Sequence, residues 1–292
     1  MKRFEILDPN SIEETCELLA RYGEEAKVYA GGTALVKLMK KRLVHPSFLL
    51  DLKGIQGLHF IREEEDRLTI GALSTLREIE TSPLVRQRIG VLGEMIHTIG
   101  SVQIRNVGTL AGNLCLADPA SDPAPLLIAL RANLKVAGSG GKRTIPPEEF
   151  FSDFYETALL PEEILEAIEI PFLPQHSGAV YLKHTMREAF DLGVVGVAVR
   201  LDLERKDGMC SDVRIVLGGV TSTPARLQKV EALLKGKWID ESLIARVAMT
   251  ASGEVDPIQD VRASAEYRRE MIEVFVERGI KNALERAKGG VS

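Results

Sequence analysis

Two glycine-bearing segments of this 292-residue chain carry the residue types that bind phosphate groups. The first is residues 30–35, Ala-Gly-Gly-Thr-Ala-Leu, and the second is residues 109–113, Thr-Leu-Ala-Gly-Asn. Glycine lets the chain turn through positive φ and approach a ligand closely, and consecutive N–H groups in such turns form a concavity that binds anions. One such segment is weak evidence. Two of them in one small domain predict a dinucleotide whose diphosphate is held from both sides.

The residues around the first segment alternate between strand and helix patterns, which is typical of parallel βαβ units. We expect strands at residues 4–7, 27–30 and 48–52, with helices at 12–22 and 34–42. The first segment therefore lies between a strand and a helix. The N-terminal amides of that helix point outward, which favours the binding of phosphate.

The rest of the chain is expected to be an α+β subdomain followed by a second α+β domain. The first of these has predicted strands at 68–72 and 163–170, a hairpin of 133–137 with 142–145, and helices at 76–81, 83–95 and 123–131. After a linker at 173–178, a three-stranded antiparallel sheet (179–184, 194–204, 211–218) precedes three helices, at 225–235, 241–251 and 264–288. The predicted fold class is α+β, with an N-terminal βαβ subdomain at 1–53, a second subdomain at 54–172 and a C-terminal domain at 177–288.

Composition excludes several classes of protein. The 37 basic and 42 acidic residues give a net charge of −5 without a basic block, so no nucleic-acid partner is expected. No apolar run approaches the ~18 residues of a membrane span, and the first residues lack the apolar core of a signal peptide. Cys16, Cys115 and Cys210 show no C-x-x-C spacing and the five histidines are scattered. These patterns predict no disulfide, no metal site in this chain and a reducing, cytoplasmic location.

Each candidate residue also has a purely structural interpretation. Residues 30–35 are consistent with an ordinary strand-to-helix turn, and they do not match the G-x-G-x-x-G pattern of a Rossmann site. Thr33 is either the N-cap of the next helix or a phosphate donor. Asp122, which precedes Pro123, suits a helix cap, and Lys183 suits a solvated strand lysine. Residues 98–122, by contrast, predict a long ordered loop, and such loops are usually functional.

The second segment lies within a longer motif that makes a family resemblance specific. The motif reads Gln103-Ile104-Arg105-Asn106-x-Gly108-Thr109-x-x-Gly112-Asn113, followed by Asp118-Pro119-Ala120-Ser121-Asp122. With Ala30-Gly31-Gly32-Thr33 upstream, it resembles the flavin (medium) subunits of the molybdenum hydroxylases, the xanthine dehydrogenase and aerobic carbon monoxide dehydrogenase family. The resemblance covers nearly the whole chain. Two C-terminal motifs support it, LGGVxxxPAR at residues 217–226 and SAEYRR at residues 264–269.

The resemblance implies FAD, bound without covalent attachment between the two N-terminal subdomains, in a PCMH/VAO-type FAD-binding domain. It implies no catalytic residue in this chain, because substrate hydroxylation is expected on another subunit. By position, Lys183 matches a lysine beside the isoalloxazine, where an ammonium would stabilise the negative charge of the reduced flavin and raise its potential. The residues that match cofactor contacts of the family are Val28, Tyr29, Ala30, Gly31, Gly32, Thr33, Ala34, Leu35, Ile99, Thr109, Leu110, Ala111, Gly112, Asn113, Asp122, Leu165 and Lys183.

The sequence departs from the family pattern at two of these positions. Ala111 stands where many members have a third glycine, so this residue must adopt an ordinary φ if the loop is to keep its contact with phosphate. Ala34 stands where a polar or acidic residue is common, which removes one side-chain contact. The chain also lacks the cysteine-bearing insertion of the benzoyl-CoA reductase branch.

The family picture implies an electron-transfer subunit. Molybdopterin and two-iron two-sulfur clusters are expected only on partner chains, a large molybdopterin subunit and a small iron–sulfur subunit, in a dimer of heterotrimers. Electrons would pass from the clusters through FAD to an external acceptor such as NAD, quinone or oxygen. Two alternatives remain open: a self-contained FAD-dependent oxidase or reductase with carriers such as Tyr155, His184 or Arg187, and a partner-binding module without flavin. Carbon monoxide, an aldehyde, a purine and an N-heterocycle all remain open as the substrate of the complex.

Overall fold

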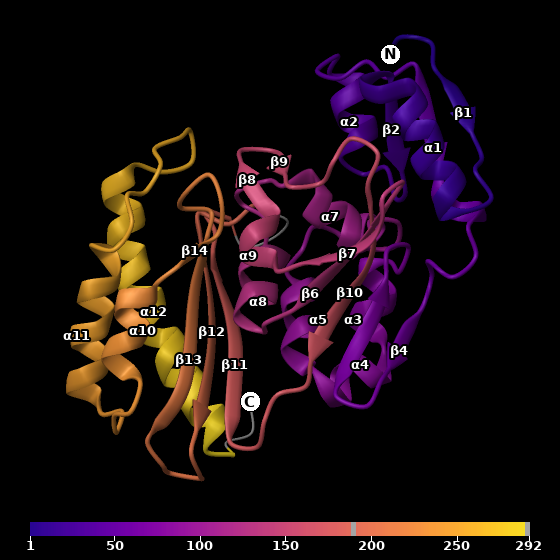
Figure 1. The fold of residues 1–292 in the computed structure, drawn as a ribbon. Helices are drawn as coiled ribbons and strands as arrows, with labels where there is room; N and C mark the ends of the chain where they lie inside the picture. The colour runs from indigo at the N-terminus through magenta and orange to yellow at the C-terminus, as the bar shows by residue number, and fades with distance from the viewer. Residues whose placement is uncertain (188–190, 290–292) are drawn as a thin grey trace.

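The computed structural model describes residues 1–187 and 191–289 and contains three main β-sheets with helices packed against them (Figure 1). The N-terminal, central and C-terminal sheets follow one another across the molecule in the order of the sequence. Each has a hydrophobic core of its own beside it. The predicted α+β class is confirmed.

The N-terminal part is the predicted βαβ unit. Its three strands pair in parallel in the order β1-β3-β2, where the strands are β1 (Glu5–Leu7), β2 (Ala26–Tyr29) and β3 (Phe48–Asp51). The connecting elements are the helices α1 (Ile12–Tyr22) and α2 (Leu35–Lys40) and the 3-10 turns η1 (Gly23–Glu25) and η2 (Leu52–Gly54). Ser11 caps α1, and Leu19 of that helix packs against Leu50 of the sheet. The first glycine segment is therefore the β2–α2 connection.

The central sheet has five strands, all antiparallel, in the order β4-β5-β10-β6-β7. The strands are β4 (Ile61–Glu63), β5 (Arg67–Gly71), β6 (Asn133–Gly138), β7 (Gly141–Ile145) and β10 (Ile164–Pro171). The predicted hairpin and the strands at 68–72 and 163–170 are confirmed, whereas β4 was not predicted. Helices that pack beside this sheet are α3 (Leu76–Thr81), α4 (Pro83–Arg88), α5 (Gly90–His97) and α8 (Pro123–Ala129).

Two local predictions for the central part are wrong, and three short elements were not predicted. The single helix expected at 83–95 is two helices, because Ile89 leaves the helical conformation (φ −145, ψ 60) and is buried in the core. The long loop expected at 98–122 contains the short helices α6 (Val102–Arg105) and α7 (Leu110–Leu116), since Ser101 and Thr109 act as helix N-caps. Three short elements were not predicted: α9 (Pro147–Phe150), β8 (Phe151–Asp153) and β9 (Glu156–Thr157).

The C-terminal part is an antiparallel sheet covered by helices on one face (Figure 1). The sheet has four strands in chain order, one more than predicted: β11 (Ser177–His184), β12 (Val195–Leu203), β13 (Cys210–Gly218) and β14 (Ala225–Arg226). The added strand β14 takes the first residues of the helix expected at 225–235. The three predicted helices are present as α10 (Gln228–Leu234), α11 (Glu241–Ser252) and α12 (Ala265–Ala287).

Helix α8 joins the central and C-terminal parts. It contacts β12 and β13 on the face of the C-terminal sheet that α10–α12 do not cover. Ala179, Ala198 and Val216 of that sheet belong to the same core cluster as the residues of α8. Because every residue of α8 is buried, the segment that leads into it is held firmly between the two sheets. That segment ends in Asp122.

Candidate functional site

The first glycine segment lies against residues 107–108, which directly precede the second. A Cβ at Gly31 would lie 1.9 Å from the carbonyl oxygen of Val107 and 2.9 Å from Cα of Gly108. A Cβ at Gly108 would in turn lie 3.6 Å from Cγ2 of Thr33. Glycine is therefore required at position 31 because two backbones approach each other more closely than any side chain allows. The β2–α2 connection and the segment that leads into α7 thus form one continuous surface.

The first segment has the geometry of an anion-binding turn. Gly32 adopts a left-handed φ of +67, and a Cβ there would lie 2.4 Å from the ring of Tyr29, so only glycine fits. Within the described residues, the amides from Gly31 to Leu35 donate no hydrogen bond to the protein. Thr33 does not cap α2, because the N-cap position is Ala34 and no side chain caps that helix. The consecutive free amides and the Thr33 hydroxyl match the donor set of an anion nest.

The second segment is a helix start and not a glycine turn. Thr109 is the N-cap of α7, and its hydroxyl accepts a hydrogen bond from the Gly112 amide at 3.0 Å. Gly112 does not have a positive φ, so the expected left-handed turn is wrong at this position. Ala111 also has an ordinary helical φ, as its methyl group requires. In the described part of the chain the amide of Ala111 has no acceptor, as is usual in the first turn of a helix.

A buried ion pair lies at the other end of the second segment. Lys183 Nζ, on β11, donates to Asp122 Oδ2 at 2.8 Å, and the Tyr181 hydroxyl donates to Asp122 Oδ1 at 2.7 Å. The side chains of Lys183 and Asp122 are 7% and 5% exposed. Asp122 makes no capping bond to α8, although Pro123 follows it as predicted. Asp122 therefore stands at the predicted N-cap position without capping the helix through its side chain, and the interpretation of Lys183 as a solvated lysine is wrong.

Burial shifts the pKa values of Asp122 and Tyr181 in this cluster. It raises the pKa of the Asp122 carboxyl above its ordinary value, while the charge of Lys183 and the hydrogen bonds from Lys183 and Tyr181 oppose that rise. Burial and the neighbouring Asp122 raise the pKa of the Tyr181 phenol well above its ordinary value. Tyr181 is therefore a permanent hydrogen-bond donor. The cluster presents a fixed ammonium whose counter-charge comes from a carboxylate on a different domain.

The backbone around Ile99 is held by an arginine that the sequence analysis did not select. Nη1 of Arg105, on α6, donates to the carbonyls of Ile99 and Gly100 at 2.9 and 2.8 Å. Its Nε donates to Glu80 at 2.9 Å, and both side chains are buried. Lys183 Nζ also donates to the carbonyl of Thr98, at 3.3 Å. Arg105 stands within the Gln-Ile-Arg-Asn motif, but nothing in that motif marks its side chain as buried.

The other predicted residues are more scattered. Leu165 lies on β10 beside a β-bulge and is buried in the core, 4% exposed, so its side chain is not placed to meet a ligand. Asn113 Oδ1 accepts a hydrogen bond from the Ser121 hydroxyl at 2.5 Å, which ties α7 to the turn before Asp122. Val28, Ala30 and Leu35 are half-buried around the first segment.

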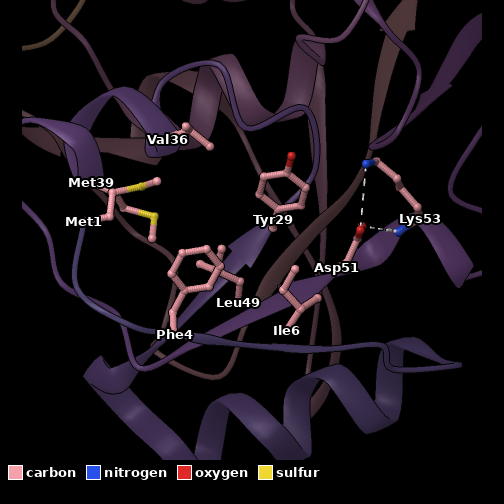
Figure 2. Close-up of a pocket in the computed structure, with 9 residues that line it drawn as sticks. All are labelled: Met1, Phe4, Ile6, Tyr29, Val36, Met39, Leu49, Asp51 and Lys53. Atoms are coloured by element: carbon pink, nitrogen blue, oxygen red, sulfur yellow. Dashed lines mark hydrogen bonds and ion pairs between the residues drawn. The ribbon is translucent and has the colours of Figure 1, made fainter.

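A separate pocket of about 310 Å³ opens on the N-terminal part (Figure 2). Apolar side chains from β1, β2, β3 and α2 line it, with Asp51 and Lys53 at one side. Tyr29 is the one predicted cofactor residue in its lining. Since no residue of the second glycine segment lines this pocket, it is distinct from the surface that the two segments form.

The residues present fit a flavin dinucleotide. The glycine cradle at Gly31 and Gly32 and the free amides beside it suit a diphosphate, and the buried Lys183 suits the negative edge of a reduced flavin. Among the residues that the structure describes, no group of three or more His, Cys, Asp or Glu is placed to hold a metal ion. None of the described helices is long and apolar enough to cross a membrane.

The fold and the site together define a flavoprotein with a two-part dinucleotide-binding region and a C-terminal sheet domain. Residues 2–173 match the family described as the FAD binding domain in molybdopterin dehydrogenase. Residues 180–283 match the CO dehydrogenase flavoprotein C-terminal domain. The chain belongs to this family: it is an FAD-binding subunit of the molybdenum hydroxylases, which are oxidoreductases.

Similar proteins extend over almost the whole chain. The 6-hydroxypseudooxynicotine dehydrogenase complex subunit alpha of Paenarthrobacter nicotinovorans is 35% identical, over 98% of this chain and 96% of that protein. The carbon monoxide dehydrogenase medium chain of Hydrogenophaga pseudoflava is 34% identical, over 97% and 98%. A solved structure of carbon monoxide dehydrogenase from the latter organism superposes with a TM-score of 0.94 at 33% identity, covering 98% of each chain.

Proposed function

We propose that this chain holds FAD as the electron-transfer group of a molybdenum hydroxylase complex. When bound, the flavin supplies the chemistry of the subunit, which is transfer of electrons from iron–sulfur clusters of a small partner subunit to an external acceptor. The observation that carries the proposal is the contact of Gly31 with Gly108, which directly precedes the second glycine segment, beside a row of amides without protein acceptors. Family membership supports it further.

We assign the diphosphate to the surface between the two segments. The amides from Gly31 to Leu35 would hold it from one side, and the start of α7, at Thr109–Gly112, from the other. The Thr109 hydroxyl accepts from Gly112 and keeps its own proton free for a phosphate oxygen. The Asn113 side chain is held by Ser121, so it would orient the start of α7 rather than bind the diphosphate itself.

We assign the isoalloxazine to the other end, beside Ile99, Asp122 and Lys183. The ammonium of Lys183 would lie near the edge of the ring that becomes negative on reduction, and it would favour the reduced form. Asp122 and the Thr98 carbonyl fix the position of this ammonium through bonds of 2.8 and 3.3 Å. Tyr181 holds Asp122 from the opposite side. The protein would therefore place charge and exclude water, and no side chain of this chain is assigned a catalytic proton transfer.

The partners follow from the same proposal. The relatives carry names such as medium chain and complex subunit alpha, which supports assembly with an iron–sulfur small subunit and a molybdopterin large subunit. We propose a dimer of such heterotrimers in the cytoplasm. The boundaries 1–53, 54–172 and 177–288 are proposed for the two FAD subdomains and the C-terminal domain. The ranges of the two family matches, 2–173 and 180–283, support the boundary near residue 175.

The alternative of a self-contained oxidase needs an acid or base above the flavin. His184 Nε2 is hydrogen-bonded to the Tyr267 hydroxyl at 2.9 Å, so this ring is already partnered within the C-terminal domain. Tyr155 is exposed, and its hydroxyl lies 3.5 Å from Asp118. Turnover of an organic substrate by this chain alone would support that alternative.

Titration of the purified chain with FAD tests the proposal. The native chain should bind FAD and quench its fluorescence, whereas Gly32→Val and Gly112→Val should not. Gly32→Val places a branched side chain at a positive φ against the Tyr29 ring, and Gly112→Val adds bulk beside the Thr109 hydroxyl. Gly140→Val is the matched control, since it lies in a hairpin turn with open space around it. Native chain that takes up no FAD, or loop variants that stay yellow with unaltered absorbance, would refute the assignment.

A further inference from the structure

The two C-terminal motifs that the proposed function does not use meet at one buried arginine. Arg268, in the 264–269 motif at the start of α12, is 1% exposed. Its Nη1 donates to the carbonyls of Val194 and Gly219, the latter from the 217–226 motif. Its Nη2 donates to Asp260 Oδ1 at 2.7 Å. One guanidinium therefore joins the start of β12, the end of β13 and the loop before α12.

Gly219 connects this arginine to the turn that carries Asp122. Its amide donates to the carbonyl of Pro119 at 2.8 Å. Its φ is +75, and a Cβ there would lie 3.2 Å from the carbonyl oxygens of both Gly193 and Val194. Gly219 thus touches the 118–122 turn on one side and the Gly193–Val194 peptide on the other, and a side chain at this position would separate the two.

The Gly193–Val194 peptide lies directly against the buried ion pair. A Cβ at Gly193 would lie 3.5 Å from Cγ of Lys183, 3.6 Å from its Cε and 3.9 Å from Asp122 Oδ1. These are ordinary van der Waals distances, so the peptide covers the pair without strain. Gly218 packs more tightly on Pro125 of α8, where a Cβ would lie 2.9 Å from the proline Cγ. Movement of this peptide would change the space available to the Lys183 side chain.

We propose that Arg268 is a positioning residue for the flavin site, which it serves by clamping the Gly193–Val194 peptide and Gly219 against Lys183 and Asp122. This inference rests on the proposed function, because it concerns the ammonium assigned to the isoalloxazine. We call Arg268, Asp260 and Gly219 the C-terminal clamp.

The chemistry of the clamp requires arginine. The planar guanidinium presents donors in fixed directions and reaches acceptors on three segments at once, which the single ammonium of lysine does not do in the same geometry. Asp260 balances its charge and also accepts from the amides of Arg262 and Ala263. The positive charge of Arg268 is therefore neutralised locally, and its effect on the flavin would be transmitted through the position of Lys183.

The test is a double-mutant cycle between the clamp and the ammonium. Arg268→Lys and Asp260→Asn are made in the native chain and in a Lys183→Met background, and the affinity for FAD and the reduction potential of the bound flavin are measured. Arg269→Ala is the matched control, because it removes the neighbouring arginine of the same motif, whose ion pair with Asp256 is on the surface. The Asp260→Asn variant retains a hydrogen-bond acceptor, and it tests the clamp even if Arg268→Lys folds poorly.

In the native background, each clamp variant should weaken FAD binding roughly ten- to a hundredfold, the scale of one charged hydrogen bond, and should lower the reduction potential. In the Lys183→Met background the same substitutions should lower the potential no further, because coupled residues are non-additive. Arg269→Ala should change neither quantity. A general loss of stability would lower affinity in both backgrounds alike.

Two results overturn the inference while leaving the proposed function intact. One is that the native chain binds FAD but the clamp variants have the same flavin reduction potential as Arg269→Ala. The other is a clamp effect of equal size in both backgrounds, which would make Arg268 purely structural. A native chain that binds no FAD would instead refute the proposed function and the inference with it.

Discussion

Replacing Lys183 with methionine should destabilise the protein strongly, because it leaves the Asp122 carboxylate buried without a cation. Both side chains are almost fully buried and their charged atoms are 2.8 Å apart. Methionine keeps the apolar stem, so the change is mainly one of charge. Removal of one partner from a buried ion pair costs about 3–5 kcal/mol. At about 2–4 °C per kcal/mol for chains of this order of size, the unfolding midpoint should fall by roughly 6–20 °C.

The loss should depend on pH with a defined sign. Burial raises the pKa of the Asp122 carboxyl and Lys183 opposes that rise, so removing Lys183 raises the pKa further. A carboxyl whose pKa is higher in the folded state binds more protons there than in the unfolded state. The stability therefore falls as pH rises from the ordinary carboxyl pKa through the folded-state pKa. The deficit of Lys183→Met against the native protein should be larger at pH 8 than at pH 5.

Thermal unfolding of the FAD-free protein, followed by circular dichroism at both pH values, measures these effects. Adding Asp122→Asn to Lys183→Met should recover much of the loss, because no uncompensated charge is then buried. Lys235→Met is the control: its ammonium is 63% exposed in its pair with Asp212, and its removal should cost at most about 1 kcal/mol. The reasoning fails if Lys183→Met unfolds with the native midpoint, shows the same deficit at both pH values, or gains nothing from the second substitution.

Three further predictions concern the rest of the site. Gly31→Ala should destabilise the protein by about 1–3 kcal/mol and weaken FAD binding at least tenfold, because its methyl group collides with the facing carbonyl just before the second segment. Urea titration and FAD titration measure the two effects, and Gly140→Ala should change neither quantity. Arg105→Met should lower the free energy of urea unfolding by about 3–5 kcal/mol. Arg77→Met removes an exposed partner of the same carboxylate, that of Glu80, and should cost at most about 1 kcal/mol. Equal losses would contradict the burial argument. Tyr181→Phe should cost about 1.5–3 kcal/mol at pH 8, the scale of a hydrogen bond to a charged group, and an unchanged unfolding midpoint would show that this bond contributes nothing.

Much of the fold could be predicted because local patterns and tertiary structure agree. The strand–helix alternation of the first fifty residues predicts that β1, β2 and β3 pair in parallel, and the meander pattern predicts β11, β12 and β13. The errors lie where tertiary contacts override a local pattern. Ile89 breaks a helical run because its side chain is needed in the core, and Ala225–Arg226 pairs with β13 before the helix begins.

The sequence predicts which residues belong to the candidate site but not which of them bond to one another. Ser101 and Thr109 lie in the stretch expected to be a loop, whereas both cap short helices, since the same oxygen serves a phosphate or an amide equally well. The resemblance places Asp122 and Lys183 each near the flavin, but their direct bond depends on how the C-terminal sheet packs on α8. Arg105 and Arg268 were missed as positioning residues because nothing local distinguishes a buried arginine from a solvated one.

The ion pair shows why the FAD-binding part and the C-terminal domain must function together. Asp122 comes from the turn before α8, whereas Lys183 and Tyr181 come from β11. The exposed face of α8 that would result from removing the C-terminal sheet is entirely apolar, since Ala198 and Val216 share its core. A chain cut near residue 173 would therefore lose the ammonium of the site and uncover the helix that positions its carboxylate. The charge that we assign to the isoalloxazine is thus a property of the junction between the two domains, which is where we also propose that the C-terminal clamp acts.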